Sequence, residues 1–194
     1  MSMGFMMNTD DAVVWRGPML GKALQQFIDD VDWGELDILV LDMPPGTGDV
    51  QLSLAQLLPV SGAVVVTTPQ DVAFADVRRA LSMLTKTKTP VLGLIENMSH
   101  FICGDCGSTH HLFGASRVDE HAKEHEVEVL AKIPLDSVTA LSADAGKPIV
   151  IAQPESEPAL LYKELANTVL GTLHVKAPEE TPEEKFSSFF KMKR

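Results

Sequence analysis

The sequence has 194 residues, enough for one domain with a sizeable core, and its 45% hydrophobic and 22% charged content is ordinary for a soluble globular protein. Its formal net charge of −11 argues against a general nucleic-acid or anionic-membrane binder, because phosphate contacts need clustered Lys and Arg. No apolar run approaches the ~20 residues of a membrane helix, and residues 1–7 lack the basic flank of a secretory signal.

The predicted elements begin with an amphipathic helix over residues 23–31, where apolar side chains recur at helical spacing. The run before it, Gly17 to Lys22, is not a phosphate-binding loop. That motif, G-x-x-x-x-G-K-[ST], needs four residues between its glycines and a hydroxyl residue after the lysine. Here three residues separate Gly17 from Gly21, and Ala23 follows the lysine.

Residues 38–49, with the sequence ILVLDMPPGTGD, form the stretch around which we expect the fold to be arranged. The apolar residues 38–41 predict a buried strand of a parallel sheet that brings Asp42 to the edge where ligands bind. A carboxylate there is typical of a Walker B aspartate that holds Mg²⁺, and Gly46 just beyond it can offer an N–H to a γ-phosphate. An ordinary strand–turn–helix, with Asp49 as the N-cap of the next helix, stays open on these residues alone.

The chain then alternates strands and helices. We expect a strand over residues 62–68, a helix over 72–85 with Asp71 as its N-cap, and a strand over 90–95. This alternation predicts βαβ units in a doubly wound α/β sheet. Asn97 follows the last of these strands, and its amide can both donate to and accept from a base edge, although an isolated Asn there is also a common turn former.

The two cysteines of the chain, Cys103 and Cys106, stand at C-x-x-C spacing, which suits one metal centre. Zinc or a [4Fe–4S] cluster takes four ligands, so two must come from another segment or another chain, and a two-fold dimer would supply them. Two other possibilities stay open, a zinc site completed by His110 or His111 and two incidental buried cysteines. A thioredoxin-like redox pair is disfavoured, because no helix follows directly to lower a thiol pKa.

The remaining segments predict one further strand, with helices before and after it, and a tail. A polar helix over residues 113–126 contains His121 and His125 in an H-x-x-E-H pattern, which we interpret as a solvated face. A strand over 127–133 leads through Pro134 and Leu135 to Asp136, a candidate N-cap, and a last helix covers 157–173. We therefore expect one α/β domain over residues 1–173 and a disordered tail over 174–194.

Several of these segments together resemble one family. They are similar to the deviant-Walker P-loop ATPases, the class that contains MinD and ParA. The segments that carry this resemblance are WRGPM at 15–19, WGELD at 33–37, the 38–49 stretch, Asn97, the C-x-x-C pair and IPLD at 133–136. Within that class the sequence resembles the Mrp (ApbC) family of iron–sulfur cluster carriers. The resemblance runs from about residue 3 to about residue 170 and implies a three-layer, doubly wound, mostly parallel sheet.

The resemblance also implies a function and its residues. A labile [4Fe–4S] cluster would bridge Cys103 and Cys106 of two chains in a homodimer, which delivers it to apo iron–sulfur proteins. Such a carrier would work in the cytoplasm, or in the mitochondrial matrix of a eukaryote, without a nucleic-acid or membrane partner. ATP and Mg²⁺ would be bound in the intact family protein, with Asp42 and Gly46 as catalytic residues and with Asp42, Pro45, Gly46, Asn97, Pro134 and Leu135 as cofactor-binding residues.

The sequence departs from the family at the phosphate loop, K-G-G-x-G-K-[ST], which these residues do not contain. We expect the chain to be an N-terminally truncated member that alone binds ATP poorly and hydrolyses it negligibly, because no loop lysine holds the phosphates. Two other functions stay open: a nucleotide switch of the MinD/ParA type and a zinc-binding, non-catalytic module.

Overall fold

The computed structural model describes residues 1–2, 5, 17–43, 51–52, 54 and 58–174. The chain divides into two compact units, one of Met1–Ser61 with Arg79–Thr89 and one of Gly62–Arg78 with Pro90–Arg194. The predicted single domain over 1–173 stays a prediction. Of the predicted tail, residues 175–194 lie outside the described residues.

In the first unit, α1 (Gly17–Asp29) confirms the predicted amphipathic helix and begins earlier than expected. Pro18 stands in its first turn, where the missing N–H of proline costs no helical hydrogen bond. After the helix, the indole Nε1–H of Trp33 donates to the carbonyl of Phe27 at 3.1 Å. This bond ties the segment after α1 to the last turn of the helix.

The prediction of a strand over residues 38–41 is wrong, because the structure has no strand there. Residues 38–43 have no strand or helix assignment, and Val40 is 84% exposed. Backbone N–H and C=O groups form a strand only when a neighbouring strand accepts and donates their hydrogen bonds. No described strand pairs with these residues, so their apolar character alone does not make them a strand.

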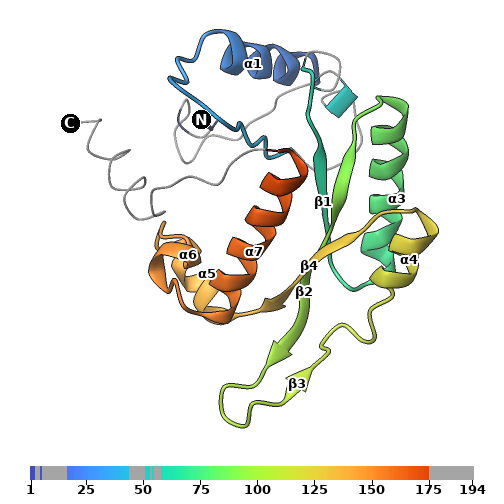
Figure 1. The fold of residues 1–194 in the computed structure, drawn as a ribbon, viewed down its shortest axis with the longest axis vertical. Coiled ribbons are helices and arrows are strands. Elements are labelled where there is room, and N and C mark those ends of the chain that lie inside the picture. Colours follow the sequence, from blue (N-terminus) through green and yellow to red (C-terminus); the bar gives the residue numbers. More distant parts are fainter. Residues whose placement is uncertain (3–4, 6–16, 44–50, 53, 55–57, 175–194) are drawn as a thin grey trace. The chain divides into compact units, whose positions relative to one another are not determined.

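The second unit contains the sheet, and its architecture confirms the predicted α/β class with a mostly parallel sheet (Figure 1). Among the described residues, β2 is the central strand, with β1 and β4 parallel to it and β3 antiparallel at its end. The strands are β1 (Ala63–Thr67), β2 (Val91–Ile102), β3 (Thr109–His110) and β4 (Val129–Leu135).

Tight packing holds the parallel strands together. Leu94 and Ile133 are buried at the centre of the sheet, and Gly93 lies directly against Leu130 of β4. A Cβ on Gly93 would overlap Cγ of Leu130, so only glycine lets β2 and β4 approach this closely.

Helices cover the strands on both sides, since Figure 1 shows α7 on one side of β4 and α4 on the other. Asp136 caps α5, as predicted, by accepting a hydrogen bond from the Thr139 N–H at 2.7 Å. Ser156 caps α7 in the same way. None of the described helices is both long and apolar enough to cross a bilayer. The helices are α3 (Asp71–Lys86), α4 (Val118–Glu124), α5 (Ser137–Asp144), α6 (Ile149–Ala152) and α7 (Glu157–Thr172).

Candidate functional site

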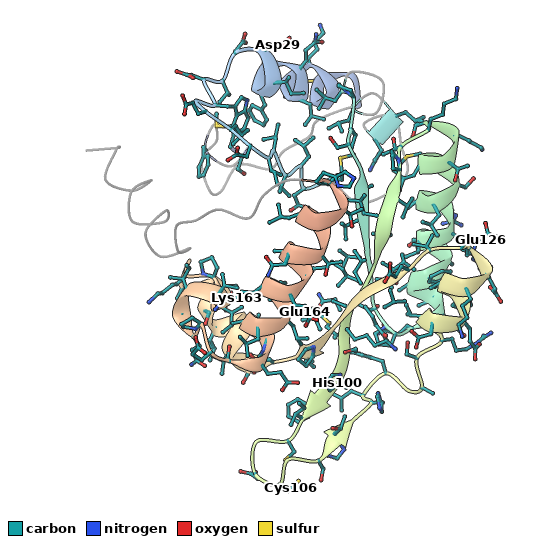
Figure 2. The ribbon with its side chains drawn as sticks, viewed as in Figure 1. Asp29, His100, Cys106, Glu126, Lys163 and Glu164 are labelled. Carbon is teal, nitrogen blue, oxygen red and sulfur yellow. The ribbon has the colours of Figure 1, made fainter. Side chains whose placement is uncertain are left out.

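The two cysteines lie on a hairpin that β2 and β3 form beyond the parallel part of the sheet. Cys103 donates its backbone N–H to the carbonyl of Ser108 at 3.0 Å, and its own carbonyl accepts from the Gly107 N–H at 2.8 Å. Gly107 has φ +70°, the left-handed conformation that glycine adopts without strain. The hairpin thus closes tightly around the C-x-x-C segment, with Cys106 at its far end (Figure 2).

The two thiols differ in exposure, and the surroundings of Cys106 lower the pKa of its thiol. Cys103 is half-buried and Cys106 is exposed, and neither forms a disulfide. The Ser108 hydroxyl lies 3.3 Å from the Cys106 sulfur and lowers the pKa of that thiol, and the Ser108 backbone and the Cys103 side chain lower it further. Thiolates are the form that binds metal, and the lowered pKa raises the fraction of Cys106 present as thiolate. Ser108 was not singled out from the sequence, and its position two residues after Cys106 is the signal that was available.

Histidines surround the hairpin but do not complete a metal site in the structure. The ring of His110 lies 6.4 Å from the ring of Phe101, and the ring of His111 lies 6.4 Å from that of His100. Among the described residues, no group of three or more His, Cys, Asp or Glu side chains is placed to hold a metal ion. The described part of one chain therefore offers the two thiols and no third ligand beside them.

The predicted adenine-binding residues lie on β2 and β4, close to the base of the hairpin. Asn97 pairs with Ile133 and Phe101 pairs with Leu135, so these two strands bring Asn97, Pro134 and Leu135 into one neighbourhood. Whether they bind a nucleotide stays a prediction.

The strand that carries Asn97 is longer than predicted, because β2 runs on through residues 96–102 instead of ending at residue 95. Met98 has φ +56°, and the pairing with β4 is irregular between Asn97 and Phe101. The Asn97 Oδ1 accepts from the Met98 N–H at 3.0 Å, and the Ser99 hydroxyl donates to the carbonyl of Ile133 at 3.1 Å. These bonds hold a bulge that lets β2 continue to Cys103.

A buried carboxylate that the sequence analysis did not single out lies next to Asn97. Glu96 is 1% exposed, and neither of its carboxylate oxygens has a hydrogen-bond partner among the described residues. The Lys132 Nζ lies 3.6 Å from Glu96 Oε2 and also bonds the Asp119 carboxylate. This chain of charges ties β2, β4 and α4 together. The only signal in the sequence was a glutamate directly after an apolar run.

Of the three predicted nucleotide-binding residues Asp42, Pro45 and Gly46, the structure describes one, Asp42. Asp42 is exposed and belongs to the first unit. Pro45 and Gly46 lie outside the described residues. The catalytic roles of Asp42 and Gly46 therefore stay predictions.

The predicted solvated face of α4 is wrong at His121. Its side chain is 13% exposed, and its ring stacks on the Phe74 ring with centroids 4.2 Å apart. The His121 Nε2 and Nδ1 lie 3.3 Å from carboxylate oxygens of Asp71 and Glu124. Hydrogen bonds from His121 and the charge of Arg117 lower the pKa of Asp71. A histidine ring is able to pack on an aromatic ring while its nitrogens still bond to groups at the surface. The burial of the His121 ring is therefore not visible in a sequence pattern of charged residues.

Comparisons with known proteins identify the family. A family model described as "NUBPL iron-transfer P-loop NTPase", of the ParA group, matches residues 1–170. The chain is 44% identical over 185 residues to the iron–sulfur cluster transfer protein NUBPL of Dictyostelium discoideum, covering 95% of this chain and 57% of that protein. It is 47% identical over 173 residues to the iron–sulfur cluster carrier protein of Escherichia coli, covering 89% of this chain and 47% of that protein.

Solved structures agree with the fold. A nucleotide-binding protein from Archaeoglobus fulgidus in complex with ADP superposes with a TM-score of 0.62 at 39% identity, covering 71% of this chain and 56% of that one. MinD from Pyrococcus horikoshii, complexed with Mg-ADP, gives 0.58 at 25% identity, with 81% and 59% covered.

The chain spans about half the length of these curated relatives. Over that span the family model and the relatives confirm the resemblance to the Mrp/ApbC carriers. The chain therefore belongs to the NUBPL iron-transfer family of P-loop NTPases.

Proposed function

We propose that this chain carries an iron–sulfur cluster on Cys103 and Cys106 and delivers it to apo iron–sulfur proteins. The observation that carries the proposal is the hairpin, which presents two free thiols together, one of them with a lowered pKa. The names of the relatives support it, because they are called iron–sulfur cluster transfer or carrier proteins.

The cluster is a [4Fe–4S] cluster bridging two chains in this proposal. Such a cluster takes four cysteine thiolates, and one chain contributes two. A two-fold dimer pairs Cys103 and Cys106 with the same residues of a second copy. Because the bridging thiolates then lie at a subunit boundary, separation of the copies exposes the cluster to an acceptor.

Nucleotide binding belongs to the same proposal for the intact protein. Asn97, Pro134 and Leu135 would contact the adenine, while Asp42, Pro45 and Gly46 would face Mg²⁺ and the γ-phosphate. The ADP complex of the archaeal relative supports this. ATP turnover also needs a phosphate loop, which the 194 residues do not contain.

We place the carrier in the cytoplasm, or in the mitochondrial matrix if the cell is eukaryotic, with apo iron–sulfur proteins and a second copy as its partners. The net charge of −11 supports the expectation that nucleic acid and anionic membranes are not among them.

Anaerobic reconstitution with iron and sulfide tests the proposal. The chain should become brown and hold about four iron atoms per dimer, because four thiolates complete one cluster. Cys103→Ala and Cys106→Ala should each abolish the colour and the cluster-linked dimer, whereas His111→Ala, on the same hairpin, should not. The loaded protein should also activate an apo-acceptor that itself takes a [4Fe–4S] cluster.

Mononuclear zinc is the competing outcome, and it leaves the visible spectrum blank. A monomer that holds one zinc ion per chain and loses it after His110→Ala or His111→Ala would overturn the carrier proposal.

A further inference from the structure

The His121 ring on α4 lies between two carboxylates, and each of its ring nitrogens faces one of them. Its Nε2 is 3.3 Å from Asp71 Oδ1, at the start of α3, and its Nδ1 is 3.3 Å from Glu124 Oε2, one turn further along α4. An ionised carboxylate only accepts hydrogen bonds. Both ring nitrogens must therefore carry a proton if both bonds are to form, and a ring with two N–H groups is the positively charged imidazolium.

Packing holds the ring in this position. It stacks on the Phe74 ring with centroids 4.2 Å apart, and Phe74 is buried. Because the His121 side chain is itself only 13% exposed, water replaces a lost partner poorly. The neutral ring has a single N–H group, so one nitrogen then turns a lone pair toward a carboxylate oxygen. Whichever nitrogen keeps the proton, the neutral ring loses one of the two bonds.

Two further charged or titratable groups lie around these contacts. Arg117 lies 3.4 Å from the Asp71 carboxylate and 3.0 Å from that of Glu120, so it acts on His121 through Asp71. The His125 ring meets the Phe74 ring with centroids 5.9 Å apart. The hydrogen bond from His121, and also the charge of Arg117, lower the pKa of Asp71. Asp71 therefore stays ionised throughout the pH range in which a histidine changes its charge.

We propose that His121 is a pH-sensitive clasp, which holds α4 against the start of α3 when the ring is protonated and loosens when the proton is lost. Histidine ordinarily changes its charge between about pH 5 and pH 8. Bonds that only the protonated ring makes add stability at the acid end of this range and are lost as the pH rises through it. In Figure 1, α4 is the first helix after β3, and α3 begins in the loop that follows β1. The clasp thus fixes the segment that returns from the hairpin to the end of the sheet at which β1 finishes.

Hydrogen exchange of the metal-free, reduced chain at about pH 6 and about pH 8 tests the inference, with rates corrected for intrinsic exchange at each pH. The equilibrium constant for opening of α4 should be about three- to tenfold larger at the higher pH, because one bond to a carboxylate is lost. A larger change is not expected, since both carboxylates are 62% exposed and solvent screens the bonds. The amides of α7, a helix without histidine, should change by less than about twofold.

Two matched pairs of variants assign the effect to this ring. His121→Gln should abolish the pH dependence, because an amide does not titrate, whereas His125→Gln, one turn along the chain, should keep it. Glu124→Gln should reduce the dependence to less than about half, because its amide can accept from the ring or donate to it and so suits both states of the ring. Glu120→Gln should keep the full effect, since that carboxylate bonds Arg117.

The inference is overturned if α4 of the wild-type chain opens equally at both pH values, or if the pH dependence survives His121→Gln. Circular dichroism checks that each variant keeps the wild-type fold. If His121→Gln does not, the Glu124→Gln and Glu120→Gln pair decides, because both side chains are exposed, and an equal pH dependence in these two variants overturns the inference. Every measurement uses the metal-free chain, so its outcome is independent of the proposed cluster.

Discussion

The pairing of Glu96 with Lys132 gives a stability prediction that can be worked from the structure. Lys132→Met keeps the aliphatic stem but removes the cation, which leaves the buried Glu96 carboxylate without its charge partner. At 3.6 Å, a unit charge pair is worth about 5 kcal/mol at an effective dielectric constant of about 20. The Lys132 side chain is 42% exposed, so solvent screens part of this energy. We expect the free energy of unfolding to fall by about 3 kcal/mol, the lower end for breaking a buried pair.

Urea denaturation followed by circular dichroism measures the effect as a lower midpoint at an unchanged slope. The double variant Glu96→Gln/Lys132→Met removes both charges and should recover to within about 1 kcal/mol of wild type, as replaced buried pairs often do. Asp119→Asn is the control, because its bond to Lys132 lies at the surface and is worth less than about 1 kcal/mol. The reasoning is refuted if Lys132→Met unfolds within about 0.5 kcal/mol of wild type, the usual range for a surface substitution.

Three further predictions follow from the same structure. Gly93→Ala should lower the free energy of unfolding by about 1–3 kcal/mol, because its Cβ would collide with Leu130; an unchanged urea midpoint would contradict the close approach of β2 and β4. Asp136→Ala should cost about 1 kcal/mol through loss of the α5 cap, measured in the same way, and Asp136→Asn should cost less. In the metal-free, reduced chain, Cys106 should react with iodoacetamide faster than Cys103 at neutral pH. Because Ser108 lowers the Cys106 pKa, Ser108→Ala should raise that pKa and shift the rate profile of Cys106 to higher pH, and an unshifted profile would rule out that role.

Much of the sheet could be predicted because its strands are short apolar runs separated by amphipathic helices. The patterns predicted β1 and the helix α3 within a residue or two of their observed bounds, and α7 likewise. The spacing of apolar residues in such patterns reflects which side chains are buried, and this spacing can be seen in a short stretch of sequence. The pairing of strands is harder to predict from a local pattern, because it depends on which other strands lie beside a segment in the fold. Residues 38–41 have the composition of a buried strand, yet no described strand pairs with them.

The candidate site was predictable in its residues and not in its geometry. The C-x-x-C spacing identified Cys103 and Cys106, but polar residues at 96–99 predicted the end of a strand. The structure instead continues β2 through a bulge, in which Met98 takes a left-handed conformation that sequence preferences disfavour. As a result, the strand that carries Asn97 leads directly into Cys103. That His110 lies opposite Phe101 across the hairpin follows only from the β2–β3 register.

Native mass spectrometry of the anaerobically reconstituted chain tests the central claim most directly. It measures the mass of the intact complex, which gives the number of chains and the bound iron and sulfide together. The account predicts the mass of two chains plus a single [4Fe–4S] cluster, and a mass of one metal-free chain when Cys103 or Cys106 is replaced by alanine. A wild-type spectrum that shows a single chain with a zinc ion, or two chains that stay together without inorganic sulfide, would contradict it.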